Sequence, residues 1–432
     1  MAFSTAQQIL CRAIDDQFPS YLNDWQNISH QCYTSPDTKI QELFFPLLHH
    51  NGFSVQYLDP DQQILYGEYM VQAPQTLLFY VKDTAQASAQ QVVFPLFSQM
   101  AALQAYIHSS GPPPVNIKWL ISGQGQTALP SLTRILSEQP HLFQADGCIL
   151  YTTKHEISKV IDQTEIILGR KGHLAVEILL QVAEQAIPIS YGAIAPNAAW
   201  QLLWLLASVK NEHEEILLDG FYDSLLPAED EVIEALSHLP DTSEELAASW
   251  GTAQLLLKLQ GVQQHYACFL TPGCNITMLD SKPATQLQVE NNETETSELY
   301  IPPQARARLD FCLLAGQDPY NIFTKLEPQL QSQTSYPLHC RLVAAQPPIY
   351  TSVNTPLVQQ LIQILTNVYQ HPPILLPHNS ETAIYTLLAR QLAAPTIGIA
   401  PPLLSKLSTE QASLQLAQNI KQSILFLASM RK

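Results

Sequence analysis

The chain has 432 residues, more than one ordinary hydrophobic core organises, which predicts two domains or one domain inserted into another. Hydrophobic residues make up 46% of the chain, so we expect a globular rather than a disordered protein. Its 21 Lys and Arg residues against 38 Asp and Glu residues give a net charge of -17, which argues against nucleic acid or an anionic membrane as a partner.

The cysteines and the N-terminal segment both favour a cytoplasmic protein. The 7 cysteines are scattered and include no C-x-x-C pair, as expected of free thiols in a reducing compartment. Residues 1–18 read as an amphipathic helix that contains acids, and not as a basic segment followed by an apolar export signal. No apolar run approaches the length that spans a bilayer. We therefore expect a cytoplasmic location.

Apolar strand-like runs alternate with helical patterns in the first 165 residues. The expected helices are 38–52, 90–107 and 130–139, and the expected strands are 54–58, 64–69, 76–81, 115–122 and 145–153. This alternation predicts an α/β layer with a largely parallel sheet.

The pattern changes after about residue 165. The expected elements are a strand at 173–182, a helix at 197–209, short strands at 265–270 and 275–279, a strand at 305–315, a helix at 319–332 and a strand at 338–345. This order predicts a βαββαβ unit that carries an acidic insertion at about 225–250.

The first pattern returns near the C-terminus. The expected helices are 350–369 and 381–392, and the expected strands are 373–376 and 395–400. We therefore expect one discontinuous α/β domain, residues 1–165 and 347–432, interrupted by an inserted domain of residues 166–346.

The order and spacing of several short motifs carry a resemblance to a known family. The motifs are "LYGEY" before "TLLFY", "PVNIKWLISGQGQ" before "ADGCIL", and then "LGRKGHLAVEI", "GAIAPNAAW", "DGFYD", "LDFCLLAGQDP" and "VNTPLVQ". Over nearly its whole length the chain resembles the zinc-dependent peptidases that include carnosinase-like dipeptidases, aminoacylase, acetylornithine deacetylase and glutamate carboxypeptidase, and it is most similar to the dipeptidase branch. The resemblance implies a peptidase-like α/β domain with a mostly parallel sheet, plus an inserted α+β, ferredoxin-like lid and dimerisation domain.

The family holds two zinc ions with carboxylates and imidazoles, and a Glu takes a proton from the bridging water. The resemblance places other residues at these positions. The first ligand His is replaced by Lys82 and the Asp after it by Thr84, while the segment with the bridging Asp is missing after Ser88. The remaining replacements are Gly125 for the catalytic Glu, Gln126 for the ligand Glu, Thr152 for a ligand Asp and Lys406 for the last ligand His. The sequence therefore predicts no catalytic residue, no metal ligand and no cofactor.

The inserted domain departs from the family in the same way. The run whose His enters the partner subunit's site reads Gln185 to Ile189, and the substrate-clamping Arg is replaced by Cys312. Asn197 is retained. Asn197 and Cys312 are predicted to line a vestigial cleft together with the replaced positions of the first domain, which are Lys82, Thr84, Gly125, Gln126, Thr152 and Lys406. We expect Cys312 to be a buried inert thiol, with a place facing the cleft as the alternative.

Several local patterns have both a structural and a functional interpretation. The loop "SGQGQT" is suited to an anion, but it lacks the residues of a P-loop, which favours a plain loop. "NEHEEI" at 211–216 lacks a second zinc-binding His, and a solvated helix end is favoured. The expected roles of the remaining residues are helix capping for His49 and His50, polar surface for His155 and His173, and core for Trp200 and Trp204, with a subunit interface as the alternative for that helix.

The favoured function is therefore a degenerate homologue that neither binds zinc nor hydrolyses peptides. Such a protein would keep the scaffold to bind a small ligand or a protein, and we expect a homodimer through the inserted domain or pairing with a paralogue. The alternative is a metallohydrolase of dipeptides or N-acyl amino acids that uses other ligands. A pure assembly partner is a third interpretation.

Overall fold

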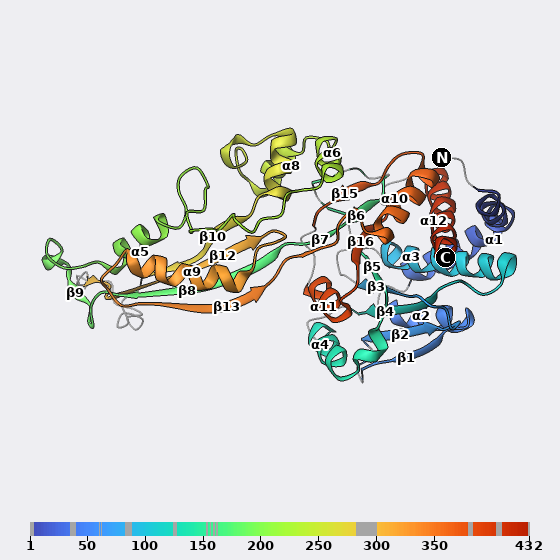
Figure 1. Ribbon diagram of the computed structural model, residues 1–432, viewed down its shortest axis with the longest axis horizontal. Coiled ribbons are helices and arrows are strands. Elements are labelled where there is room, and N and C mark those ends of the chain that lie inside the picture. The colour runs from blue at the N-terminus through green and yellow to red at the C-terminus, as the bar shows by residue number, and fades with distance from the viewer. Residues whose placement is uncertain are drawn as a thin grey trace. The chain divides into compact units, whose positions relative to one another are not determined.

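The computed structural model describes residues 4–34, 40–59, 61, 63–82, 89–123, 128–152, 154–155, 157–158, 160, 163–281, 300–378, 383–402 and 408–430. The chain divides into two compact units. Unit 1 comprises Met1–Arg170, Ala228–Phe269 and Tyr350–Lys432, and unit 2 comprises Lys171–Pro227 and Leu270–Ile349 (Figure 1). The acidic insertion, which we expected inside the second domain, therefore groups with unit 1. One reason is Glu229, whose carboxylate accepts hydrogen bonds from the Tyr350 hydroxyl and the Val353 amide.

Unit 1 is built on an eight-stranded sheet with the order β1-β2-β4-β3-β5-β16-β6-β15. Strands β4, β3, β5 and β16 are parallel, whereas β1, β2 and β6 join through antiparallel pairs. The strands are β1 (Ser54–Tyr57), β2 (Ile64–Tyr69), β3 (Thr76–Lys82), β4 (Asn116–Ser122), β5 (Gly147–Tyr151), β6 (Glu165–Ile167), β15 (Ile374–Leu376) and β16 (Thr396–Ala400). Strands β4 and β16 are buried throughout and β3 is buried except at its two end residues, as expected of a sheet covered on both faces.

Helices of unit 1 pack in two groups. Helix α12 contacts α1, α3 and α10, α3 also contacts α1 and α2, and α4 contacts α11. The bounds are α1 (Thr5–Thr34), α2 (Ile40–His50), α3 (Ala89–Ser110), α4 (Ala128–Glu138), α6 (Asp230–Ser237), α7 (Ser243–Trp250), α8 (Gly261–Leu270), α10 (Pro356–Tyr369), α11 (Ala383–Leu392) and α12 (Thr409–Ser429). Short elements are η1 (Pro140–Phe143), η3 (Leu256–Lys258), β7 (Gly169–Arg170) and β14 (Ile349–Tyr350). None of the described helices is long and apolar enough to cross a membrane.

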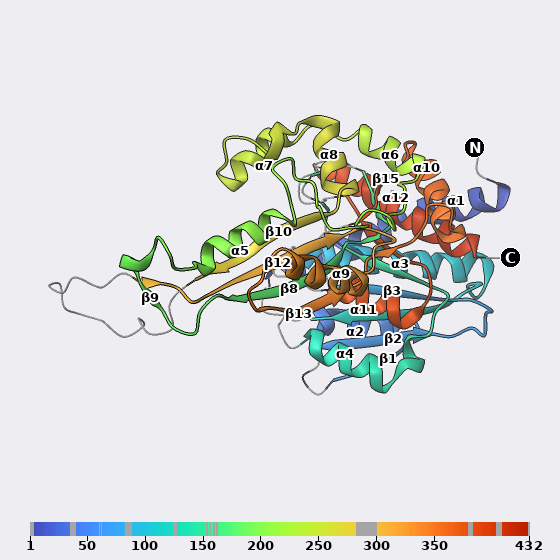
Figure 2. The ribbon, with the colours of Figure 1, turned by 60° about the vertical axis from the view of Figure 1, so that its left-hand side comes forward.

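Unit 2 is a four-stranded antiparallel sheet with the order β10-β12-β8-β13 and two helices on one face (Figures 1 and 2). Its elements are β8 (Gly172–Gln181), β9 (Ile187–Pro188), η2 (Ile189–Tyr191), α5 (Ala198–Ala207), β10 (Gly273–Asp280), β11 (Tyr300–Ile301), β12 (Gln304–Leu313), α9 (Pro319–Ser332) and β13 (Leu338–Gln346). The main elements follow the predicted βαββαβ order. The predicted fold class is thus confirmed.

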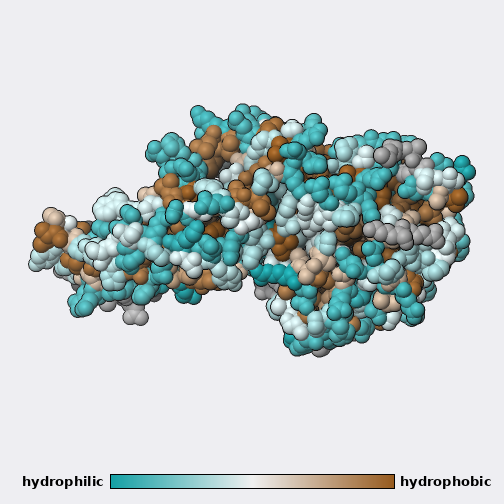
Figure 3. All heavy atoms as spheres, in the orientation of Figure 1, coloured by the Kyte–Doolittle hydropathy of each residue, from teal (hydrophilic) through white to brown (hydrophobic). Residues whose placement is uncertain are grey.

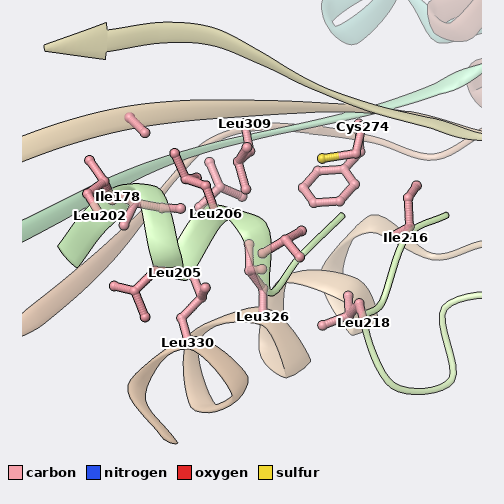
Figure 4. Packing of buried hydrophobic residues seen from close by; sticks show 14 of the residues in the cluster. Ile178, Leu202, Leu205, Leu206, Ile216, Leu218, Cys274, Leu309, Leu326 and Leu330 are labelled. Carbon is pink, nitrogen blue, oxygen red and sulfur yellow. The ribbon is translucent and has the colours of Figure 1, made fainter. Parts of the chain in front are cut away.

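Alternation along the strands of unit 2 separates a buried face from an open one. In β12 the buried residues are Ala305, Ala307, Leu309, Phe311 and Leu313. Leucines of α5 and α9 pack against this face, and Figure 4 shows Leu202, Leu206, Leu326 and Leu330 with Leu309 in one apolar cluster. The residues of β12 between these point to the opposite face of the sheet, which neither helix covers.

Two predicted features of the chain are wrong. Residues 265–270, expected as a strand, lie in α8, where Gln264, His265 and Phe269 are buried at helical spacing. Trp200 and Trp204, expected in the core, are 58% and 60% exposed. The reason is that α5 buries a single stripe, and the two indoles lie one turn apart outside that stripe.

Two further local interpretations meet different outcomes. The segment 211–216, expected as a helix end, forms a turn in which the Asn211 carbonyl oxygen Oδ1 accepts from the amides of His213 and Glu215. The capping interpretation of the histidine pair is confirmed at His50, because its Nδ1 lies 2.8 Å from the carbonyl oxygen of Pro46.

Candidate functional site at the sheet edge of unit 1

The carboxyl ends of the parallel strands of unit 1 meet along one edge of its sheet. Strand β3 lies between β4 and β5, which follow it in the chain on opposite sides. The topological switch point is therefore the end of β3. Open α/β sheets bind ligands at this point, because the loops diverge there and leave a crevice.

Two of the predicted cleft residues lie at this edge. Lys82 is the last residue of β3, is half-buried, and pairs with Ser122 of β4. Thr152 directly follows β5, and its amide donates to the Ile399 carbonyl at 3.0 Å. Because Val81 pairs with Tyr151, Lys82 and Thr152 occupy neighbouring strand ends. Thr84, Gly125, Gln126 and Lys406 lie outside the described residues.

The end of β4 is fixed by buried polar contacts. The hydroxyls of Tyr80 and Ser122 lie 2.6 Å apart in the interior. The amide of Gly123 donates to the Gln63 carbonyl at 2.6 Å, and the Gln41 side chain donates to the same oxygen at 3.0 Å. A Cβ at Gly123 would come within 2.5 Å of both glutamine side chains, so the glycine permits this close approach. The loop that follows thus starts from a rigid point.

A buried carboxylate, Glu165, stands at the same edge and was not anticipated from the sequence. It begins β6 and pairs with Ala400, the last residue of β16. Its side chain is 0% exposed and lies 3.8 Å from the ammonium of Lys154, itself 6% exposed. The Ser158 hydroxyl and the His155 amide donate to the two carboxylate oxygens, the amide at 3.0 Å. Burial raises the pKa of Glu165, although Lys154 and these donors oppose the shift.

Lys154 ties the chain after β5 to the start of β6. Its ammonium donates to the carbonyl oxygens of Val160 and Gln163 in addition to its contact with Glu165. A buried ammonium is tolerated only with such partners. The cluster of Lys154, Ser158 and Glu165 therefore holds this segment in place beside Thr152. Because the carboxylate is enclosed among these partners, it holds the edge of the sheet in place.

The expected polar-surface role of His155 is wrong. Its ring is half-buried and packs on Phe269 with the ring centroids 4.9 Å apart. Phe269 in turn packs against His378, whose Nε2 lies 2.8 Å from the Phe269 carbonyl oxygen. The two imidazoles thus anchor the end of α8 inside unit 1.

The two predicted cleft residues of unit 2 have different local roles. Asn197 caps α5, because its Oδ1 accepts from the amides of Ala199 and Trp200 at 2.9 and 3.2 Å. Cys312 lies in β12 and is exposed, so the expectation of a buried thiol is wrong. The strand alternation explains the error, since Cys312 falls on the open face between buried Phe311 and Leu313.

A pocket of about 290 Å³ lies in unit 2 between α5 and β10. Apolar residues such as Leu203, Leu206 and Ile276 line most of it. Lys210 at its rim pairs with Glu214 and donates to the Cys274 carbonyl at 3.0 Å. None of the predicted cleft residues lines this pocket.

The residues at the described edge do not fit a dinuclear zinc site. Where the resembling family has an imidazole and a carboxylate, this edge carries the ammonium-bearing Lys82 and the hydroxyl of Thr152, and an ammonium repels Zn²⁺. Within the described part of the chain, no three His, Cys, Asp or Glu side chains are grouped so that they could hold a metal ion. All the replacements at the family's ligand positions, those of Lys82 and Thr152 included, stay predictions from the resemblance.

Comparisons with known proteins bear on the fold. No family model and no curated protein matches the chain. The M20 family metallo-carboxypeptidase Sso-CP2 from Sulfolobus solfataricus matches with a TM-score of 0.67 and 21% identity, over 90% of this chain and 94% of that one. The chain adopts the M20 metallopeptidase fold.

Two dipeptidase structures with the M20 fold match almost from end to end. Human carnosine dipeptidase 1 has a TM-score of 0.58 and 15% identity, and the di-peptidase Dug1p from Saccharomyces cerevisiae has a TM-score of 0.59 and 11% identity, each with 99% of both chains covered. The large, mostly parallel sheet and the small antiparallel sheet correspond to the catalytic and dimerisation parts of the M20 architecture. At such identities the likeness is one of fold.

Proposed function

We propose that this chain is a catalytically degenerate homologue of dinuclear zinc peptidases, which binds a small polar ligand or a protein partner without hydrolysing it. The observation that carries the proposal is Lys82 at the end of β3, the strand of the switch point. The resemblance assigns a zinc-ligating His to this position. A cation at this position favours a carboxylate or another small anion over a metal ion.

The metal content of the protein tests this proposal. Protein purified without chelator is expected to carry far less than one zinc per chain by elemental analysis, and to leave dipeptides and N-acyl amino acids intact after soaking in zinc. Stoichiometric zinc together with hydrolysis would overturn the proposal and support the alternative, a metallohydrolase with other ligands.

The ligand side of the proposal depends on the ammonium of Lys82. We expect small carboxylates or dipeptides to bind the wild type, with about tenfold weaker affinity in Lys82→Met, since losing one charge-assisted contact costs about 1–2 kcal/mol. Calorimetric titration measures this difference. Lys258→Met removes an exposed lysine elsewhere in unit 1 and is the matched control. Equal affinities in all three proteins would contradict a role for Lys82.

We further propose that unit 2 carries the surface for a second copy of this chain or a paralogue. Exposed apolar side chains support this: Trp200 and Trp204 stack on the outer side of α5, and Ile189 and Ile194 lie beside β9, where Figure 3 shows hydrophobic atoms at the surface. A stable interface buries about 800 Å² on each partner and is rich in Trp. The net charge of -17 repels nucleic acid and anionic membranes, so the proposal includes neither as a partner.

Sedimentation distinguishes the possible partners. We expect a homodimer that the double substitution of Trp200 and Trp204 by Ser converts to monomers, with Trp250→Ser, which changes an indole that is 63% exposed in unit 1, as the control. A monomeric wild type would leave pairing with a paralogue as the remaining form of the proposal, and co-purification of the two chains tests it.

A further inference from the structure

The open face of the unit 2 sheet carries a thiol, an imidazole and a carboxylate on neighbouring strands. Cys312 and Asp310 lie two residues apart on β12, so both point to this face. His173 of β8 pairs directly with Cys312 in the antiparallel register. On the other side Cys312 pairs with Gly273 of β10, which has no side chain to cover the thiol. The sulfur is thus exposed with an imidazole as its neighbour.

Distances follow from this register. Directly opposed residues of antiparallel strands have their Cβ atoms about 4.5–5.5 Å apart. The side chains of His173 and Cys312 therefore stand next to each other on this face of the sheet. The sequence predicted only a polar surface residue at His173, whereas in the structure it lies opposite a thiol and contacts a carboxylate.

The imidazole of His173 is oriented by Asp310. Its Nε2 lies 2.7 Å from Oδ1 of that carboxylate. Because an ionised carboxylate only accepts, Nε2 carries the proton, and Nδ1 of the neutral ring is the nitrogen with an available lone pair. The contact with Asp310 therefore fixes which ring nitrogen carries the proton.

Asp310 is itself held from several directions. The guanidinium of Arg308 donates to its two oxygens at 2.9 and 3.1 Å, and the Thr277 hydroxyl donates to Oδ2. Partial burial alone would raise the pKa of Asp310, but the hydrogen bonds from Arg308, Thr277 and His173 outweigh it and hold the pKa below its usual value. The carboxylate stays ionised and fixes the imidazole.

We propose that Cys312 is a reactive thiol that undergoes thiol–disulfide exchange with low-molecular-weight disulfides, with His173 as its base and Asp310 as a positioning residue. Nδ1 of His173 takes the thiol proton, and the Cys312 sulfur attacks one sulfur of the disulfide. A new sulfur–sulfur bond forms as the old one breaks, and the departing thiolate takes the proton from the imidazolium. One cysteine is oxidised to the mixed disulfide while one half of the small disulfide is reduced to a thiol.

Disulfide exchange fits this face better than acyl transfer does. Hydrolysis through a thiol needs amide donors for an oxyanion, and β12 and β8, which carry Cys312 and His173, are inner strands whose amides pair with neighbouring strands. In disulfide exchange the negative charge leaves on sulfur, which needs no such donors.

The adduct is expected to persist because no second thiol lies beside Cys312 among the described residues. Cys274 of β10 pairs with Phe311, one position along, and is buried on the opposite face. Burial raises the pKa of Cys274 to about 12, which keeps that thiol unreactive. The inference does not depend on the fate of the zinc ligands in unit 1.

The test measures mixed-disulfide formation on the full chain with oxidised glutathione at neutral pH, by intact mass and peptide mapping. We expect one fast adduct, at Cys312, and about a tenfold slower reaction in His173→Gln. Added imidazole should restore much of the rate in His173→Gly and also in Asp310→Asn, because a free base needs no positioning carboxylate. A merely structural effect of either substitution would lower the unfolding midpoint and would not respond to imidazole.

Two outcomes would overturn the proposal. One is a Cys312 rate no faster than that of the half-buried Cys268 in the same protein. The other is an unchanged Cys312 rate in His173→Gln with the fold intact. Cys340→Ser is the control that should leave the rate at Cys312 as it is, since burial raises the pKa of Cys340 to about 12.

Discussion

Each unit has a carboxylate with a cation, a hydroxyl and a histidine as neighbours, but the pKa shifts of the two carboxylates have opposite signs. In unit 1, Glu165 is surrounded by Lys154, Ser158 and the backbone of His155. In unit 2, Asp310 is surrounded by a cation, a hydroxyl and a histidine as well, namely Arg308, Thr277 and His173. The pKa of Glu165 is raised and that of Asp310 is lowered.

Burial explains the difference between the two clusters. The Glu165 side chain is 0% exposed, so loss of water outweighs a cation and two further donors. The Asp310 side chain is 15% exposed and its cation, Arg308, is 33% exposed, so hydrogen bonding decides. The enclosed cluster holds the backbone in place, whereas the open one leaves a histidine and a thiol accessible to reagents. Two carboxylates with similar partners thus differ in their access to water, and the proposed thiol chemistry depends on the open one.

The largest expected difference comes from removing each carboxylate. Glu165→Ala leaves the buried Lys154 without its counter-ion and two donors without their acceptor, which should cost about 3 kcal/mol of unfolding free energy. Asp310→Ala releases partners that reach water, and should cost only about 1 kcal/mol. Urea unfolding of the two variants measures both values. Similar losses would show that burial does not separate the clusters.

A smaller difference is expected from removing each hydroxyl. Ser158→Ala leaves an oxygen of buried Glu165 short of a donor, at a cost of about 1–2 kcal/mol. Thr277→Ala on the exposed strand β10 should cost less than about 0.5 kcal/mol, because water replaces the lost donor. Denaturant midpoints at one pH compare the pair, and a costlier Thr277→Ala would contradict the comparison.

The contributions of Glu165 and Asp310 to the pH dependence of stability should have opposite signs, and each should change gradually with pH. Because the folded pKa of Glu165 lies above the unfolded value, the unfolded chain loses this proton first, and wild type should lose stability relative to Glu165→Gln as the pH rises above about 4.5. The folded pKa of Asp310 lies below its unfolded value. Its contribution should be present above about pH 3.8 and disappear below it, so the cost of Asp310→Asn should shrink as the pH falls. Thermal unfolding from pH 3 to 8 tests both, and parallel curves would count against the assigned shifts.

Much of the fold was predictable because hydrophobic periodicity reports local structure. Apolar residues at every second position of "ARARLDFCL" predict a strand, and β12 is that strand. The apolar run at 265–270 misled because six residues fit a strand or a helix equally well, and packing of His265 and Phe269 in unit 1 decided for the helix. The exposure of Trp200 and Trp204 was missed because large aromatic side chains are usually buried.

Only part of the candidate site could be predicted from the sequence, because its contacts depend on the tertiary structure. A signal for Glu165 exists in "TEIIL", where an acid begins an apolar strand, and a lysine lies in the loop before it. Its partners could not be named, because which loop atoms surround a buried carboxylate depends on the path of the chain from Lys154 to Val160.

The alternation of strands and helices and the βαββαβ order of unit 2 could be predicted from the sequence, because each depends on neighbours along the chain and on spacing. That Lys82 takes the place of a family ligand stays a prediction from the resemblance. The tertiary structure alone decided that Lys82 and Thr152 end neighbouring strands, that Glu165 is enclosed, and that His173 meets residues 137 positions away. The physical reason is strand register. Alternation along β12 sets which of its side chains share a face, but only the pairing of β12 with β8 and β10 decides which residues stand opposite Cys312 and Asp310.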